Sequence, residues 1–249
     1  MRQENSVASG QNDGPHFLYR FMQFKYLRDI IKYHRLYVPR RGQLNDPFDC
    51  VVKLSTSDTK KEKEIQSRVD KQIRVLSFSG GDSALTNPLL WSHYADGHKG
   101  VCLKFDMNIW HRSAIANAGY VLDSVQYSKK RTLVDLSVIS SGQRLAGSAF
   151  TYELTADSTE PLERIAFRKH VSWCYEQEWR MICSQKNNKE KIYLGFPPHA
   201  LVSIIIGLRM SEQNRARIKT LISRYGCSTS VQEAKEDHEA FSLVIESCP

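Results

Sequence analysis

The sequence predicts a single α+β domain, on three observations. The chain has 249 residues, which suits one large domain or two small ones. Strand-like segments recur along its whole length, with helical segments between them but without the strict alternation of a doubly wound parallel sheet. No linker-like stretch is visible after residue 16. We therefore expect one domain over residues 17–249, preceded by a loose polar leader over residues 1–16.

Strands in the first half of the chain are predicted from aromatic and β-branched runs. These runs are Phe17–Phe21, Leu36–Val38, Ile73–Phe78, Gly100–Phe105 and Tyr120–Tyr127. Helices are predicted at Tyr26–Ile31 from apolar spacing, at Ser57–Lys71 from composition, and at Leu89–Ala95, where Pro88 suits a first turn. The segment Gln43–Asp49 reads QLNDPFD and predicts a turn, because proline fixes φ after two residues that bond their own backbone.

The second half of the chain is predicted from the same signals. Composition favours helix over most of Lys129–His170, and Arg215–Tyr225 reads as a helix that ends at Gly226. Apolar runs predict strands at Glu178–Cys183, Ile192–Phe196, Leu201–Ile206 and Phe241–Ile245.

Composition excludes several classes of protein. Apolar residues make up 41% of the chain and charged residues 25%, which excludes a mostly disordered protein. No run of about 18 apolar residues is present, so we expect no membrane span. Lys and Arg total 35 against 27 Asp and Glu, a net charge of +8. This excess favours nucleic acid or phosphate partners, although a generally basic surface without a ligand would explain it equally well.

The six cysteines are scattered, without a C-x-x-C pair or a preceding signal peptide. They are typical of reduced thiols in a cytoplasmic protein. His93 and His98 are five residues apart without a cysteine pair nearby, so the sequence predicts no metal site. Signatures of serine hydrolases, dinucleotide-binding Rossmann folds and protein kinases are also missing from the sequence.

Two candidate segments carry polar groups on strands. Arg20, next to Tyr19, has a planar fork that can bind a phosphate, although a surface arginine in a sheet is the simpler reading. Ser77 and Ser79 share one face of a strand end and could orient a nucleotide or a carboxylate. The glycines that follow permit close approach of a phosphate, and the alternative is a polar strand end with a flexible turn.

Two further candidate segments carry rings and carboxylates. Trp91, His93 and Tyr94 could stack on a base or ribose, or could belong to the core of a short helix. Glu176 and Glu178 lie two residues apart at a strand start, which predicts that they share a face. In a buried site, two like charges so close are costly, so they indicate a function or a paired cation. The alternative is that both glutamates are exposed and form an ion pair with a nearby arginine.

Taken together, the segments LYRF, LNDPFD, SFSG, WSHYADGHKG and YEQEWR resemble a widespread bacterial domain family of unknown function, over about Phe17–Gly207. More faintly, they are similar to the Arg-Ser-Glu class of the ADP-ribosyltransferase superfamily. Arg20 matches the arginine of that class, Ser77 and Ser79 match its S-x-S, and Glu176 and Glu178 match its E-x-E. The N-D-P turn after the opening elements also looks like the start of DNA ADP-ribosyltransferase toxins.

The resemblance implies a split, mainly antiparallel sheet whose cleft binds NAD as a substrate, without a metal. It implies that Glu178 is the catalytic carboxylate and that Glu176 orients or deprotonates the acceptor. The residues expected to contact NAD are Arg20, Tyr19, Ser77, Ser79, Asn45, Asp46, Trp91, His93 and Tyr94. The acceptor would be a macromolecule, either nucleic acid or protein, as in a toxin or an antiphage effector.

Two other functions remain open at this point. The chain could be a nucleic-acid binding or cleaving module without NAD chemistry, or a non-catalytic nucleotide sensor. Stabilisation by NAD would support the transferase or the sensor, and nicotinamide release would support only the transferase. The catalytic role of Glu178 is tested by its replacement with glutamine. For the transferase, we expect turnover to fall roughly 10²–10³-fold or more, with little change in melting temperature.

Overall fold

The computed structural model describes residues 15–110, 120–131, 133, 165–184, 191–225 and 229–248. Its main feature is an open eight-stranded sheet. In spatial order the strands are β12 (Leu243–Ser247), β11 (Ser230–Glu236), β10 (Leu201–Ile206), β4 (Val101–Asp106), β1 (Phe17–Met22), β3 (Ile73–Gly80), β8 (Glu178–Ser184) and β5 (Tyr120–Ser124). Of the neighbouring pairs, β10 and β11 run parallel and the others antiparallel. The predicted α+β class is therefore confirmed.

Two short pairs of strands flank the main sheet. They are β2 (Arg35–Tyr37) with β9 (Tyr193–Gly195), antiparallel, and β6 (Gln126–Ser128) with β7 (Arg168–His170), parallel. The described α-helices are α1 (Leu27–Tyr33), α2 (Thr59–Gln72), α3 (Ser83–Thr86), α4 (Pro88–Tyr94) and α8 (Glu212–Tyr225). The 3-10 turns are Phe24–Tyr26, Arg41–Gln43, Val171–Glu176 and Pro198–Ala200.

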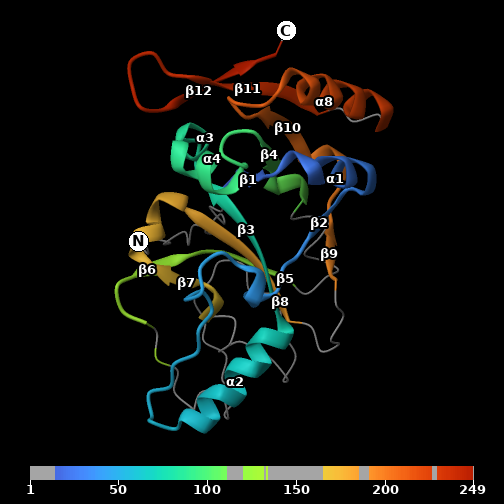
Figure 1. The fold of residues 1–249 in the computed structure, drawn as a ribbon. Helices are drawn as coiled ribbons and strands as arrows, with labels where there is room; N and C mark the ends of the chain where they lie inside the picture. The colour runs from blue at the N-terminus through green and yellow to red at the C-terminus, as the bar shows by residue number, and fades with distance from the viewer. Residues whose placement is uncertain are drawn as a thin grey trace, which may run out of the picture.

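Helix starts follow from local capping chemistry. The Asp58 side chain accepts from the Lys61 amide at the start of α2, and the Asn87 side chain accepts from the Leu89 amide at the start of α4. Pro88 occupies the first turn of α4, where its missing N–H costs nothing. Figure 1 shows α8 beside β10 and β11 at one end of the molecule and α2 at the other, with β3 and β8 between them.

Alternation along β3 and β8 separates apolar from polar residues. Leu76 and Phe78 on β3 pack with Met181 on β8 in the largest core cluster. Val75 and Ile182 face the other side, where they pack with apolar residues of α2. In the register of the two strands, Ser79 pairs with Glu178 and Ser77 with Arg180. These four polar residues therefore share the face of Val75 and Ile182.

The sheet parts between β1 and β3. β1 pairs with β3 at only two positions, Leu18 with Gly80 and Tyr19 with Ser79, whereas β1 pairs with β4 along its whole length. Beyond Tyr19 the two strands diverge, and the Arg20 guanidinium donates a hydrogen bond to the Ser77 carbonyl across the gap. This divergence creates the space in which the candidate site lies.

Most predicted elements agree with the structure to within a few residues; two of them differ from it, and one strand was not predicted. Arg168–His170 is a strand rather than helix, because it pairs in parallel with β6. Tyr120–Tyr127 is two strands, interrupted at Val125. Ser230–Glu236 is a strand that the sequence did not predict, since its Glu, Lys and Gln residues have low strand propensity and its ladders with β10 and β12 override that preference.

Several expectations lie outside the described residues. They are the leader up to residue 14, most of the helical prediction over 129–170, and the end of the last helix at Gly226. Among the described helices, none combines the length and apolarity that crossing a bilayer requires.

Candidate active site

A cavity of about 240 Å³ opens where β1 and β3 part. Its walls come from β1, β3, the end of α4, the segment 39–49 and the residues around the start of β8. Most of the predicted site residues line it: Tyr19, Arg20, Asn45, Ser77, Ser79, Tyr94, Glu176 and Glu178. Polar residues of β1, β3 and β8 therefore lie together at one cavity.

Both carboxylates converge on one lysine. Lys169 Nζ lies 2.6 Å from Glu176 Oε2 and 3.0 Å from Glu178 Oε2, and all three side chains are buried. Glu178 begins β8, whereas Glu176 ends the preceding 3-10 turn, so the two do not belong to one strand as predicted. Gln177 joins them in the left-handed conformation at φ 45° and turns both side chains toward Lys169.

An arginine completes the buried charge network. Arg180 Nε lies 2.7 Å from Glu178 Oε1, and Arg180 NH2 lies 2.9 Å from both Asp49 oxygens. Arg180 also donates to the Ala166 carbonyl. Lys169 Nζ reaches Asp49 at 3.9 Å. Three carboxylates and two cations therefore form one network of ion pairs next to the cavity. This network fixes the Glu178 carboxylate in position.

The network holds Glu178 in its charged form. Burial alone would raise the pKa of this carboxyl, but the attraction of Arg180 and Lys169 outweighs burial and lowers the pKa to about 2. The Tyr127 hydroxyl accepts from the Glu178 amide at 2.8 Å and anchors the backbone at the same point. Glu178 is thus an ionised carboxylate at neutral pH, with its orientation fixed.

Glu176 behaves differently from its neighbour. Burial raises the pKa of Glu176, Lys169 opposes the rise, and the charge of Glu178 adds to it. The net pKa is raised, although the Tyr94 hydroxyl donates a hydrogen bond to Glu176 and favours its charged form. Two carboxyls with pKa values pushed apart are typical of a pair that divides electrostatic and proton-transfer roles.

Arg20 supplies a cation on the β1 side of the cavity. The side chain is partly exposed, but its Nε atom is buried and has no hydrogen-bond partner among the described residues. Burial lowers the pKa of Arg20 to about 10, with the charge of Glu178 opposing, so the guanidinium stays charged at neutral pH. Within the described part of the chain, no carboxylate lies within ion-pair distance of it. Its charge is available to an anionic ligand.

Gly80 and Gly81, which follow the two serines, are explained by local packing and backbone conformation. A Cβ on Gly80 would lie 2.7 Å from the Trp179 ring and 3.3 Å from the Gln177 carbonyl. Gly81 adopts φ +75° beside the Gln177 side chain. The sequence suggested that a phosphate could lie close to the backbone of these glycines. That space is filled by the turn between Glu176 and Glu178. The serines line the cavity and the glycines fit this turn.

The residues of the WSHYA segment separate in space. Trp91 is fully buried, packs edge-on against Phe21 at 5.1 Å and donates to the Leu85 carbonyl at 2.8 Å, away from the cavity. His93 is exposed and lies near the ring of Trp173, with 6.3 Å between centroids. Tyr94 alone lines the cavity.

Of the predicted turn residues, Asn45 lines the candidate site and Asp46 does not, whereas Tyr19 lies at its border. Asn45 Nδ2 donates to the Tyr94 hydroxyl at 2.9 Å and so joins the Glu176 network. Asp46 is buried, accepts from the Phe48 amide at 2.8 Å and lines a different cavity. The Tyr19 hydroxyl donates to Asp82, although the residue borders the cavity.

Sequence reasoning missed the partners of the carboxylates. Lys169 lies in a segment predicted as helix, and the sequence pattern around Asp49 predicts only a turn. The alternative of an exposed glutamate pair bridged to a nearby arginine, Arg180 or Arg168, is wrong for Arg180, because Arg180 and both glutamates are buried. The signal that could have found Arg180 is its register, since it shares the alternating face of Glu178 and Ile182. In the described ranges, no group of three or more His, Cys, Asp or Glu side chains is arranged to hold a metal ion.

Comparison with known proteins identifies one domain. Residues 90–181 match DUF2971, described as a protein of unknown function. This domain runs from α4 into β8, and so contains Tyr94, Lys169, Glu176 and Glu178 of the cavity. No curated protein and no solved structure matches the chain. The match thus covers the carboxylate half of the site, while Arg20 and the two serines lie before it.

Proposed function

We propose that this protein is an ADP-ribosyltransferase that uses NAD as donor and modifies a macromolecule. One observation carries the proposal. Arg20, Ser79 and Glu178, which correspond to the Arg, Ser and Glu motifs of that superfamily, come from three adjacent strands and line one cavity. They are distant in sequence, and the register of β1, β3 and β8 aligns Tyr19, Ser79 and Glu178 across the sheet.

The cavity residues fit part of a dinucleotide. The charged Arg20, whose Nε has no hydrogen-bond partner within the described part of the chain, suits a pyrophosphate or ribose oxygen, and the serine hydroxyls suit a ribose. The cavity volume of about 240 Å³ is below the roughly 300–1,000 Å³ of sites that enclose drug-sized ligands. The proposal therefore assigns the nicotinamide and its ribose to this cavity, with the rest of NAD extending beyond it.

The reaction breaks the bond between the ribose C1′ and the nicotinamide nitrogen. The bonding electrons leave with nicotinamide, and positive charge develops on the ribose ring. Glu178, fixed and ionised, stabilises that charge from a position set before the reaction begins. Such an interaction strengthens in the transition state and adds little to ground-state binding.

Glu176 is the group suited to the acceptor. The pKa of Glu176 is raised toward neutral pH. A general base is most effective when its pKa lies near the pH at which the enzyme works. The acceptor nucleophile attacks C1′ and its proton passes to Glu176. Tyr94 and Lys169 hold the two Glu176 oxygens in place for this transfer.

A second function is favoured by one feature of the same cavity. Both Glu178 oxygens already interact with Arg180 or Lys169, so the carboxylate is well supplied with partners without any ligand. A domain that binds a nucleotide without turnover would also keep this arrangement. Nicotinamide release distinguishes the two functions, because a sensor binds NAD and releases none.

The test measures nicotinamide release from NAD and labelling of acceptor mixtures by the full chain. We expect release by the wild type, and a fall of about 10²–10³-fold in Glu178→Gln. Glu246→Gln is the control, because it removes a carboxylate paired with Lys235 at 2.6 Å on the edge strand β12. Glu176→Gln should retain NAD hydrolysis and lose labelling. Wild-type turnover in Glu178→Gln would refute the proposal, as would wild-type protein that neither binds nor cleaves NAD.

A further inference from the structure

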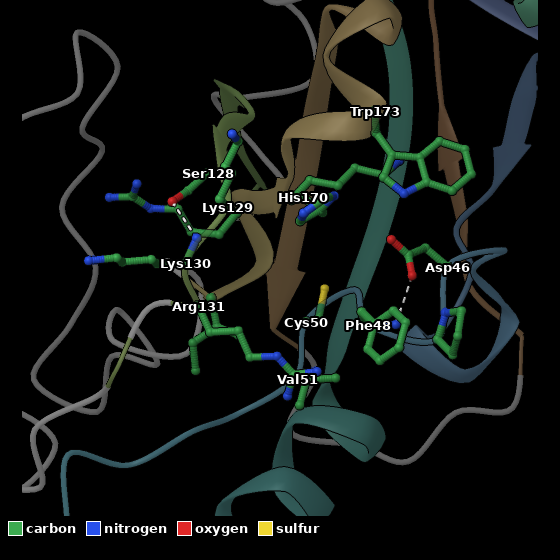
Figure 2. A pocket seen from close by; sticks show the side chains of 14 residues that line it. Asp46, Phe48, Cys50, Val51, Ser128, Lys129, Lys130, Arg131, His170 and Trp173 are labelled. Carbon is green, nitrogen blue, oxygen red and sulfur yellow. Dashed lines mark hydrogen bonds between the residues drawn. The ribbon is translucent and has the colours of Figure 1, made fainter.

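A second, larger cavity lies beside the candidate active site. Its volume is about 590 Å³, and Lys169 lines both cavities. Figure 2 shows the segment Ser128–Arg131 on one side of it, with Phe48 and Trp173 on the other. The segment begins at Ser128, the last residue of β6, and the paired strand β7 contributes Arg168, Lys169 and His170.

This cavity is strongly cationic. Lys129, Lys130, Arg131 and Arg168 line it, are exposed, and have no ion-pair partner among the residues that the structure describes. Among the described residues that line it, Asp46 is the single carboxylate, and it is buried and accepts a hydrogen bond from the Phe48 amide. Four exposed cations around one hollow produce a field that attracts a polyanion.

Aromatic rings lie among these cations. Phe48 is 65% exposed although it is a large apolar residue, and the Arg131 guanidinium lies 5.3 Å from its ring centroid. Trp173 lines the cavity, and its ring lies 4.8 Å from Lys169 Nζ. Beyond Trp173 the rings of His93 and Tyr175 continue, with centroids 6.3 and 6.1 Å from that of Trp173. Rings and cations in alternation match the bases and phosphates of a nucleic-acid strand.

We propose that this cavity binds single-stranded nucleic acid, with a base against Phe48 or Trp173 and phosphates on Lys129, Lys130, Arg131 and Arg168. A single strand is specified because its bases are free to stack on side chains, whereas a duplex keeps its bases stacked inside. The binding itself does not depend on NAD chemistry. That the bound strand is the acceptor rests on the proposed function.

Lys169 explains how such a strand would reach the reacting centre. Its ammonium contacts the Trp173 ring on one side and lies within 3.0 Å of both Glu176 and Glu178 on the other. A base held against Trp173 is therefore separated from the carboxylates by one side chain. An acceptor atom on that base or its sugar would lie on the Glu176 side of the network, where its proton can be accepted.

The test is fluorescence anisotropy with labelled 12-nucleotide strands, without NAD. We expect binding of single-stranded DNA or RNA that exceeds binding of the matching duplex. The logarithm of affinity should fall with the logarithm of salt by about 0.7 per phosphate contacted. Trp173→Ala should weaken binding about 5- to 150-fold, and Trp173→Phe should restore most of it. Phe48→Ala, at an exposed position, provides a second variant that leaves the core intact.

The charge test uses a matched pair of double variants. Lys129→Gln with Lys130→Gln should lower the salt slope by about 1.4, the value for two lost phosphate contacts. Arg217→Gln with Lys219→Gln removes two exposed cations from α8 and should leave the slope unchanged. DNA and RNA strands of equal sequence show whether the 2′-hydroxyl contributes.

Three outcomes would overturn the proposal. One is equal affinity of the wild type, Trp173→Ala and Phe48→Ala for the single strand, and another is tighter binding of the duplex than of the single strand. The third is displacement of the strand by stoichiometric NAD together with loss of NAD binding in Trp173→Ala, which would assign the cavity to the adenosine half of NAD. If the protein binds single-stranded nucleic acid but releases no nicotinamide from NAD, the proposed function is refuted and the nucleic-acid site is still supported.

Discussion

Removal of the Glu178 charge is expected to reduce stability as well as turnover. Glutamine keeps the shape of the side chain, but it leaves Arg180 and Lys169 with one fewer carboxylate in a buried site. The sequence alone suggested a change in turnover with an unchanged melting temperature. The buried ion pairs change that expectation, because removal of one partner leaves the other charge buried without compensation, which destabilises the fold.

The magnitude follows from the pKa of Glu178. Folding lowers this pKa from 4.5 to about 2. Since each pKa unit corresponds to about 1.4 kcal/mol, the charge stabilises the folded state by about 3 kcal/mol at neutral pH. Loss of one partner from a buried pair elsewhere costs about 3–5 kcal/mol, which agrees. For a chain of this length the melting temperature should fall by roughly 6–12 °C.

The assay is urea unfolding of wild type and Glu178→Gln at several pH values. A carboxyl whose pKa is lowered by folding contributes its full stability above its unfolded-state pKa, and loses it as pH falls toward about 2. The difference between the two proteins should therefore be about 3 kcal/mol at pH 7 and about 1 kcal/mol at pH 3. Glu246→Gln, at a half-exposed ion pair, should differ from wild type by less than about 1 kcal/mol.

A constant difference between pH 7 and pH 3 would refute this reasoning, because it would show that the loss comes from packing rather than from charge. No difference at all would mean that Arg180 and Lys169 are satisfied by Asp49 and Glu176 alone. Turnover is then compared at a temperature well below both unfolding transitions, so that instability is not mistaken for loss of chemistry.

Two further sets of variants test the surrounding residues. Tyr94→Phe removes the hydrogen bond that favours charged Glu176, so the acidic limb of the pH profile of acceptor labelling should move to higher pH; an unmoved limb would exclude Glu176 as the titrating base. Trp91→Ala should cost about 3–5 kcal/mol in urea unfolding, because the ring is fully buried. His93→Ala should change stability by less than about 0.5 kcal/mol, because the side chain is exposed, and equal losses in the two variants would contradict this placement.

Local pattern was sufficient for much of the site. Aromatic runs located β1 and β3, and two-residue alternation put Ser77 and Ser79 on one face. The common face expected for Glu176 and Glu178 arises differently, because Glu176 ends a 3-10 turn and Gln177 reverses the chain in the left-handed region. Nothing in the residue types around Gln177 indicates a positive φ.

The parts that sequence could not supply are set by tertiary pairing. Lys169 reaches the carboxylates because β7 pairs with β6, a contact between segments about 40 residues apart in the chain. Asp49 reaches Arg180 across 131 residues. Propensity acts over a few residues, so it identified the carboxylates and left their cations unassigned.

The buried network itself is an argument that this face of the sheet has a function beyond stability. Apolar residues of similar volume would stabilise such a site as well as ion pairs or better, since burying charges is costly. The neighbouring positions on the same face, Val75 and Ile182, are apolar and pack with α2 in the ordinary way. On this face of β3 and β8 the charged residues are Glu178, which lines the cavity, and Arg180, which is buried next to it. A carboxylate that must remain ionised and fixed beside an opening, without solvent to support it, requires these partners.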